Sequence, residues 1–308
     1  MEVLSKLEDA NKPITNEEVK KVGEELAGAL FADDIKIHFE NNLKELDQKI
    51  MRIRIKAGSN VPNYPWELLY YNGEYLSVSQ KFSLVRGIPG VSDRNGIEPE
   101  IPLQILIICA SPQDERTPQL DILTEIQSIQ TALQDLEDEQ VVKIDRIFAA
   151  TRENISEQLD KKQYNIIHFI GHGLFYENKG YLALEKKANK MLDMVSVDEI
   201  GNMFSGQHKM ALVVLNTCKG AAANTGRAFT GMAQYISEKT YCPAVIAMRY
   251  SISDRIANVF AQRFYTNVLR MAIDANLQSV RSRIWRPEMA DLNFAKPVLF
   301  MNSLDGME

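Results

Sequence analysis

Two apolar segments of strand length, each ending at small residues, constrain the fold of this chain more than any other feature. Residues 167–173 read IHFIGHG and residues 212–220 read LVVLNTCKG. Continuous apolar runs of this kind are typical of parallel strands that are buried on both faces. The residues just beyond the carboxyl ends of such strands meet at one edge of the sheet, where α/β proteins place their ligand sites. We therefore expect the turns that carry His172 and Cys218 to lie side by side.

Strand and helix patterns alternate along the chain from residue 103 onward. Apolar residues between positions 120 and 136 recur at the spacing of an amphipathic helix. Strands are expected at 103–110, 141–148, 164–170, 210–215 and 244–248, and further helices at 151–159, 196–204, 227–237, 253–270 and 275–284. This alternation predicts an α/β fold with a mostly parallel sheet and helices on both faces.

The first hundred residues have a different texture and predict a smaller amino-terminal α+β lobe. Residues 15–18 have the spacing of a helix capping box. Residues 49–56 alternate apolar and basic side chains, as in a half-exposed strand, and Asn-Gly within residues 70–75 predicts a hairpin. Residues 87–102 are rich in Gly, Pro, Asp and Asn and indicate a linker. The domains expected from this division are residues 1–100 and residues 101–308.

Composition places the chain among ordinary globular proteins. Its 308 residues, 45% hydrophobic and 25% charged, are enough to bury a core without disulfides. The net charge of −6 argues against a nucleic-acid surface. Three cysteines, an odd and sparse count, indicate free thiols in a reducing compartment. Because no apolar run has the length of a membrane helix, and the amino terminus is polar, we expect a cytoplasmic protein that makes no membrane contact.

Cys218 and His172 have the chemistry of a thiol nucleophile and its base. A free thiol with a pKa near 8.5 is only a few per cent ionised at neutral pH, and a neighbouring imidazole raises that fraction. The backbone N–H groups of Gly173 and Cys218 would form an oxyanion hole. The alternative for Cys218 is an inert buried thiol, because free cysteine is among the most buried residue types.

The other histidines and cysteines near these strands are expected to be structural. His168 lies inside an apolar run, which predicts core packing or a buried hydrogen bond. Cys109 and Cys242 lie in or beside predicted strands and are expected to be inert. Zinc held by His168, His172 and Cys218 is an alternative, but no paired ligand spacing supports it. No phosphate-binding loop is present either, so we expect neither a metal nor a cofactor.

Together these segments resemble the CHAT family, the caspase-like cysteine peptidases of prokaryotes. Besides the His-Gly and Cys segments, the resemblance is carried by PWELL at 65–69, LVR at 84–86, PAVIAMRY at 243–250, Asp254, and Phe264 with Tyr265. One departure is that residues 293–299 read NFAKPVL, where the family often has a tryptophan before its last strand. The resemblance implies a caspase-like fold and an endopeptidase with a Cys218–His172 dyad acting on protein substrates. It also implies control by a regulatory protein or ligand, within prokaryotic defence or cell-death systems.

The resemblance also suggests where a substrate side chain would be read. Caspase-like folds form the pocket for the residue before the scissile bond from loops beside the catalytic residues. The candidates here are Asp114, Arg116, Asn216, Arg249 and Asp254. The acids and the acidic net charge favour Lys or Arg in the substrate, ahead of a large apolar residue, although either arginine would neutralise an acid or select an acidic residue. Asp254 has a simpler explanation as an acid at a helix start.

Two other functions and one processing site are compatible with the sequence. A catalytically silent caspase-like interaction module would keep the fold, but the presence of both catalytic residue types argues against it. A flavodoxin-like domain that binds a nucleotide or small ligand is disfavoured by the missing phosphate loop. The charged residues 185–190 lie between the His and Cys segments, where caspase-like proteins are processed, and are a candidate for self-cleavage.

Overall fold

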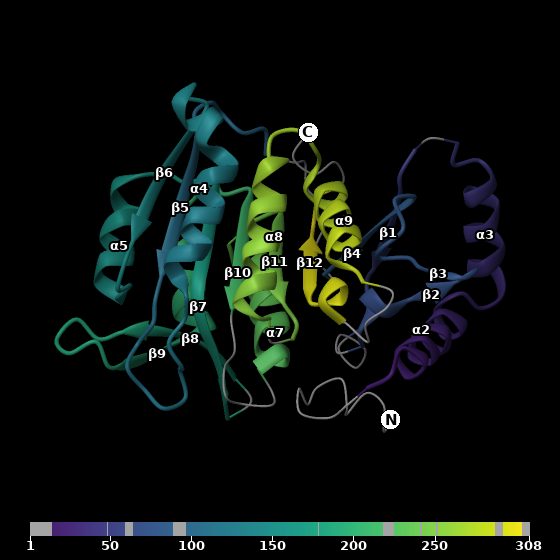
Figure 1. Cartoon of the computed structure of the whole chain (residues 1–308), viewed down its shortest axis with the longest axis horizontal. Helices are drawn as coiled ribbons and strands as arrows, with labels where there is room; N and C mark the ends of the chain where they lie inside the picture. Colours follow the sequence, from purple (N-terminus) through teal and green to yellow (C-terminus); the bar gives the residue numbers. More distant parts are fainter. Residues whose placement is uncertain are drawn as a thin grey trace.

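One central β-sheet spans the molecule and carries both of the strands singled out above (Figure 1). The computed structural model describes residues 14–47, 49–58, 64–88, 97–177, 179–217, 225–240, 242–250, 252–286 and 292–303. Its strands are β1 Met51–Ile55, β4 Phe82–Arg86, β5 Leu103–Cys109, β6 Val142–Ile147, β7 Ile166–Tyr176, β8 Lys179–Glu185, β9 Leu192–Ser196, β10 Leu212–Thr217, β11 Ala244–Met248 and β12 Pro297–Met301. Over the described residues their order is β1-β4-β12-β11-β10-β7-β5-β6, and β8 and β9 continue from β7.

The middle of the sheet is parallel, as the alternation of strand and helix predicts. Strands β6, β5, β7, β10 and β11 all run in one direction, whereas β12 is antiparallel to β11. In the register of β7 against β10, Ile166 lies beside Leu212 and Gly171 lies beside Thr217. This register brings the carboxyl ends of both strands to the same edge of the sheet.

Helices cover both faces of the sheet. One face carries α4 Ile122–Asp138, α8 Asp254–Thr266 and α9 Ile273–Ile284; the other carries α5 Arg152–Lys161, α6 Val197–Phe204 and α7 Thr225–Lys239. Along β10, Leu212 and Val214 pack toward the first set of helices, and Val213 and Leu215 toward the second. Because both faces are buried, the strand is apolar at successive positions. These layers confirm the expected fold class.

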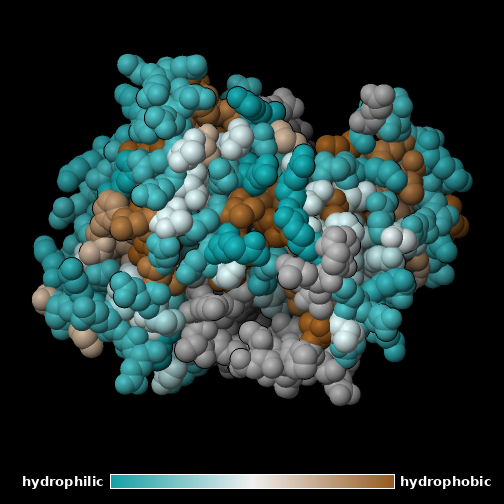
Figure 2. All heavy atoms as spheres, in the orientation of Figure 1, coloured by the Kyte–Doolittle hydropathy of each residue, from teal (hydrophilic) through white to brown (hydrophobic). Residues whose placement is uncertain are grey.

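The outer surface over α4, α8 and α9 is mainly hydrophilic, with smaller apolar patches between the charged side chains (Figure 2). Helices α4 and α8 therefore present an apolar stripe to the sheet and a polar face to solvent, whereas most of α9 is buried, including its polar residues Asp274, Asn276, Gln278 and Arg281. No helix in the described part of the chain is long and apolar enough to cross a membrane.

The amino-terminal region adds to the same sheet. It contains α2 Asn16–Leu30, α3 Asp33–Lys44, the turn η1 Trp66–Leu68 and the hairpin strands β2 Tyr70–Tyr71 and β3 Glu74–Tyr75. The capping box at Thr15 and the hairpin turn at Asn72 and Gly73, both with positive φ, confirm the sequence expectations. Strand β4 pairs with β1 and meets β12 where Arg86 lies beside Phe300. The sheet thus continues across residue 100, and the proposed domain boundary there stays a prediction.

The expectation that the His strand ends at a turn is wrong. Strand β7 continues through residues 171–173 to Tyr176, and this extension pairs with β8, with His172 beside Ala183. Gly171 is required by close packing, because a Cβ there would lie 2.5 Å from Cζ of Phe169 and 3.1 Å from the Ala110 carbonyl oxygen. The strand extends beyond Gly171 and Gly173 because it is paired with β8 of the β8–β9 hairpin. The local sequence of β7 does not reveal this pairing.

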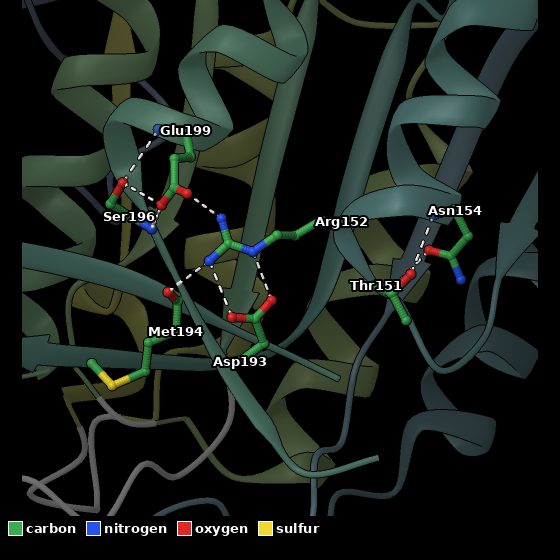
Figure 3. Close-up of polar contacts among 7 residues, drawn as sticks. All are labelled: Thr151, Arg152, Asn154, Asp193, Met194, Ser196 and Glu199. Atoms are coloured by element: carbon green, nitrogen blue, oxygen red, sulfur yellow. Dashed lines mark hydrogen bonds and ion pairs between the residues drawn. The ribbon is translucent and has the colours of Figure 1, made fainter. Parts of the chain in front are cut away.

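An arginine ties the second helical layer to this hairpin (Figure 3). Arg152, the first residue of α5, donates from Nε to Asp193 on β9 at 2.6 Å and from Nη2 to the same carboxylate at 3.1 Å. Nη2 also donates to the Met194 carbonyl at 3.1 Å, and Nη1 pairs with Glu199 of α6. Glu199 in turn completes the capping box with Ser196. One guanidinium therefore joins three elements.

Replacing Arg152 with methionine is expected to lower the free energy of unfolding by about 1–2 kcal/mol, because charge-assisted hydrogen bonds are lost at a site that solvent partly screens. Urea unfolding, monitored by circular dichroism, measures this change in the free energy of unfolding. A matched control is Lys161→Met, which breaks the exposed pair with Glu157 at 3.9 Å and should change the stability by no more than about 0.5 kcal/mol. Equal effects of the two substitutions would contradict the special role of Arg152.

Candidate active site

His172 is fixed in the extension of β7 by a hydrogen bond to the main chain. Its side chain is fully buried, and its Nε2 lies 2.7 Å from the carbonyl oxygen of Pro118 in the segment between β5 and α4. A carbonyl oxygen only accepts, so Nε2 carries the hydrogen of this bond. In the neutral ring the lone pair is then on Nδ1, which makes Nδ1 the proton acceptor.

Cys218 and the small residues that follow it lie outside the described residues. The last described residue of β10 is Thr217, which is the register partner of Gly171 on β7. In the sequence, Cys218 follows Thr217 and His172 follows Gly171. Gly173, the expected second oxyanion donor, is buried and pairs with Leu182 of β8. The dyad and the oxyanion hole stay predictions.

His168 is a buried structural histidine, as expected from its place in the apolar run. Its side chain is 0% exposed; Nδ1 lies 2.8 Å from the hydroxyl of Tyr265 on α8, and Nε2 lies 3.1 Å from Oε1 of Glu125 on α4. The same Oε1 accepts a hydrogen bond from Nδ2 of Asn216 on β10. These four residues, Glu125, His168, Asn216 and Tyr265, form what we call the Glu125 cluster.

Two of the expected pocket residues, Asp114 and Arg116, lie together and neutralise each other. Arg116 donates from Nε and Nη2 to the two carboxylate oxygens of Asp114 at 2.7 and 2.9 Å, and its backbone N–H bonds the same group at 3.0 Å. These hydrogen bonds lower the pKa of Asp114 to about 2. Asp114 is therefore ionised at neutral pH, and its charge is already matched by Arg116.

The other three pocket candidates have separate surroundings. Asn216 is 0% exposed and belongs to the Glu125 cluster. Arg249 is buried, and its guanidinium donates to the Tyr250 hydroxyl at 3.1 Å and to the Tyr64 carbonyl at 3.5 Å. Asp254 is the exposed first residue of α8, where an acid complements the positive end of the helix. In the described part of the chain these residues have different hydrogen-bond partners, and their role in specificity stays a prediction.

Cys109 and Cys242 are free thiols in the core, as expected. Both are about 1% exposed. Burial raises the pKa of each thiol to about 12, because the thiolate would lose its hydration. Neither thiol is appreciably ionised at neutral pH, so neither competes with Cys218 for an alkylating reagent.

Sequence reasoning missed Glu125 and singled out Tyr265 only as part of the family resemblance, without a role in the site. Both come from helices, and what makes them important is a contact with strand residues more than 40 positions away in the chain. A signal did exist for Glu125, because it is an acid next to the apolar stripe of its helix, where a charge is costly unless it is paired.

Solved structures with a similar fold are found among eukaryotic and bacterial proteins. Separase from Saccharomyces cerevisiae, solved with securin, aligns with 94% of this chain at a TM-score of 0.50 and 15% identity. The Drosophila initiator caspase Dronc aligns with 68% of this chain and 93% of its own, at a TM-score of 0.40 and 9% identity. A secreted C11 cysteine protease from Bacteroides thetaiotaomicron covers 58% of this chain and 57% of its own, at a TM-score of 0.37 and 7% identity. This chain spans only 18% of the separase chain.

The sequence comparisons identify the family. A comparison with curated protein sequences finds no relative of this chain. The model of the CHAT domain, in contrast, matches residues 20–299, from helix α2 to strand β12. Since this match covers most of the chain and the sheet has the layers of the caspase-like fold, the protein belongs to the CHAT domain family.

Proposed function

We propose that this protein is a cysteine endopeptidase in which Cys218 is the nucleophile and His172 transfers the protons. The observation that carries the proposal is the register of β7 against β10, in which Gly171 lies beside Thr217. Consecutive Cα atoms are about 3.8 Å apart, so His172 and Cys218, which follow these two residues, start from neighbouring positions at one sheet edge. A thiol and an imidazole at that edge are the pair that acyl transfer requires.

The contact of His172 with Pro118 suits the role of a base. The carbonyl oxygen holds the Nε2–H and so fixes both the tautomer and the ring orientation. Nδ1 then takes the proton of the Cys218 thiol. The same carbonyl stabilises the imidazolium that results, because a hydrogen bond from a charged donor is stronger than one from a neutral donor.

The reaction that follows from these roles has two steps. The Cys218 thiolate attacks the peptide carbonyl, and the imidazolium of His172 gives its proton to the leaving amine, which leaves an acyl-enzyme. Water activated by His172 then hydrolyses the thioester and releases the thiol. Backbone N–H groups of Gly173 and Cys218 would stabilise the oxyanion, each worth about 3 kcal/mol in related enzymes. No step needs a cofactor.

The substrate and the control of the enzyme belong to the same proposal. The substrate is a protein, and a regulatory protein or ligand switches the activity within a prokaryotic defence or cell-death system, as family resemblance implies. Separase, whose solved structure has a similar fold, was itself solved as a complex with securin. Because Arg116 already neutralises Asp114, a preference for Lys or Arg would rest on the other acid among the pocket candidates, Asp254. Fluorogenic peptides that differ only in the residue before the scissile bond measure this preference.

The proposal is tested by alkylating the intact protein with iodoacetamide at pH 7 and mapping the modified cysteine by mass spectrometry. We expect modification of Cys218 only, because burial raises the pKa of Cys109 and Cys242 to about 12. In parallel, a peptide library is digested with wild-type protein and with Cys218→Ala. Cleavage products that appear with both proteins would contradict the role of Cys218 as nucleophile. An unreactive Cys218, with no cleavage by either protein, would contradict the proposal and favour a silent interaction module.

The turn between β8 and β9 is the expected site of self-cleavage. The expected loop of residues 185–190 starts one residue too early, because Glu185 is buried and is the last residue of β8. Residues 186–191 are exposed, and the turn is closed by hydrogen bonds from the Lys186 N–H to the Met191 carbonyl at 2.8 Å and from the Lys190 N–H to the Lys186 carbonyl at 2.9 Å. We expect active enzyme to accumulate two fragments cut within this turn, and Cys218→Ala to stay intact. Sequencing the fragments measures it, and full activity of an uncut chain would show that self-cleavage is not the switch.

A further inference from the structure

A buried carboxylate joins the two strands that carry the proposed dyad. Glu125 of α4 is 2% exposed, and its Oε1 accepts hydrogen bonds from Asn216 of β10 and His168 of β7. Asn216 precedes Cys218 by two residues, and His168 precedes His172 by four. Strand residues separated by an even number share a face. The Glu125 cluster therefore lies on the same sheet face as His172, which α4 and α8 cover, and would lie below the proposed dyad.

The hydrogen bonds of the cluster form one directed chain. Burial raises the pKa of Tyr265, so the phenol keeps its proton and donates to Nδ1 of His168, 2.8 Å away. His168 then carries its hydrogen on Nε2 and donates it to Glu125, which also accepts from Asn216. Each member is 0–2% exposed. A buried polar network of this kind fixes a single arrangement of its members.

The segment that leads into α4 contacts β7 at a second point, four residues beyond His168. Pro118 lies four residues before the start of α4 at Ile122 and bonds His172 through its carbonyl oxygen. One turn into the helix, Glu125 bonds His168 on the same strand and Asn216 on the next. The helix and its leading segment thus fix β7 at two points and β10 at one.

We propose that Glu125 is a positioning residue. Its hydrogen bonds fix the position of β7 relative to β10 along the strand direction, and thereby the distance between Cys218 and His172. This inference rests on the proposed function. Apolar residues of similar volume would fill a buried site at least as stably as a charged group, so filling space does not explain a carboxylate here. Displacing a reacting group by about 1 Å costs on the order of 100-fold in rate, which is the scale of effect that a lost bridge should produce.

The test compares two substitutions of Glu125 with a control on the same helix. Glu125→Gln keeps an oxygen acceptor at Oε1 and removes the charge, whereas Glu125→Ala removes the acceptor. We expect kcat to fall about 100-fold in Glu125→Ala with KM within threefold, and to stay within about fivefold of wild type in Glu125→Gln. Ile129→Val, at a fully buried position outside the cluster, should leave both constants unchanged.

A second measurement does not depend on turnover: the rate of Cys218 alkylation as a function of pH. Its apparent pKa should rise toward 8.5 in Glu125→Ala, because the thiol loses its imidazole partner, and should stay at the wild-type value in Glu125→Gln. Circular dichroism and melting confirm that each variant is folded. If Glu125→Ala does not fold, Asn216→Ala removes one strand contact and should slow kcat at least tenfold.

The outcomes separate this inference from the function on which it rests. Wild-type kcat and thiol pKa in folded Glu125→Ala overturn the positioning role. A Glu125→Gln variant as slow as Glu125→Ala also overturns it, because its acceptor is intact. If wild type and Cys218→Ala are equally inactive on peptides, the proposed function fails. The pH dependence of Cys218 alkylation then still tests the positioning role of Glu125. A rise in the apparent thiol pKa confined to Glu125→Ala supports this role, and an unchanged apparent pKa overturns it.

Discussion

Replacing Cys218 with alanine is expected to abolish peptide hydrolysis, and His172→Ala should do the same. Each substitution should lower kcat by about 10⁴- to 10⁶-fold, because the thiolate and its base act as one unit. For the same reason the double variant should be no slower than either single one. The measurement is kcat/KM on fluorogenic peptides, with protein concentration and folding checked by absorbance and circular dichroism.

The two substitutions differ in what they cost the fold. His172 is buried and bonded to Pro118, so its removal should lower the stability by about 1–3 kcal/mol by leaving that carbonyl without its donor. His208→Ala is a suitable control, because His208 is exposed and follows α6 at the opposite end of the strands. It should keep full activity. Clear residual turnover in purified Cys218→Ala protein would contradict the mechanism.

The layers of the fold could be predicted because they depend on periodicity. Each strand at the centre of the sheet is apolar at successive positions, and each helix has one apolar stripe, so local sequence decides both. The end of β7 could not be predicted in this way. Residues 171–173 look like a turn, but the strand continues because β8 supplies its pairing partners from residues 179–183, up to 10 residues beyond Gly173.

Local sequence also predicted part of the candidate site. The sequence context separated the two histidines of β7, and His168 is buried and hydrogen-bonded in the core as expected. His172 is buried as well, so its catalytic role stays a prediction. The partners of these histidines came from elsewhere: Pro118 precedes α4, and Glu125 lies within it. A carbonyl oxygen leaves no trace in a sequence pattern, and a single acid on a helix has many explanations. Only the packing of α4 against β7 and β10 selects one.

Substitution of Glu67 is expected to change the stability more than any other substitution proposed here. The ion pair of Glu67 with Arg86 also joins two of the segments that carry the family resemblance. This carboxylate in the PWELL segment is 1% exposed and accepts from Arg86 of the LVR segment at 3.0 and 2.6 Å. Burial alone would raise the pKa of Glu67, but the charge and hydrogen bonds of Arg86, with the charges of Arg281 and Arg249, outweigh it and hold the pKa below its usual value. Glu67 is thus ionised among three buried arginines.

Substituting Glu67 with glutamine is therefore expected to lower the free energy of unfolding by about 3–5 kcal/mol, because it leaves buried arginine charges without their counter-charge. That is a large part of the 5–15 kcal/mol typical of a folded domain. Urea unfolding at pH 7 measures it. The double variant Glu67→Leu, Arg86→Met should recover part of the loss, since an apolar pair replaces the ion pair.

The lowered pKa of Glu67 predicts in which direction the stability changes with pH. Its pKa is lower in the folded protein than the ordinary value of 4.5, so its contribution is complete above pH 4.5 and is lost as the pH falls through the folded value. Wild type should therefore lose stability on acidification below pH 4.5 more steeply than Glu67→Gln, and the two unfolding curves should converge. If the difference between them is the same at pH 3 and pH 7, the ionised carboxylate does not hold the arginines, and the effect of Glu67→Gln is one of packing alone.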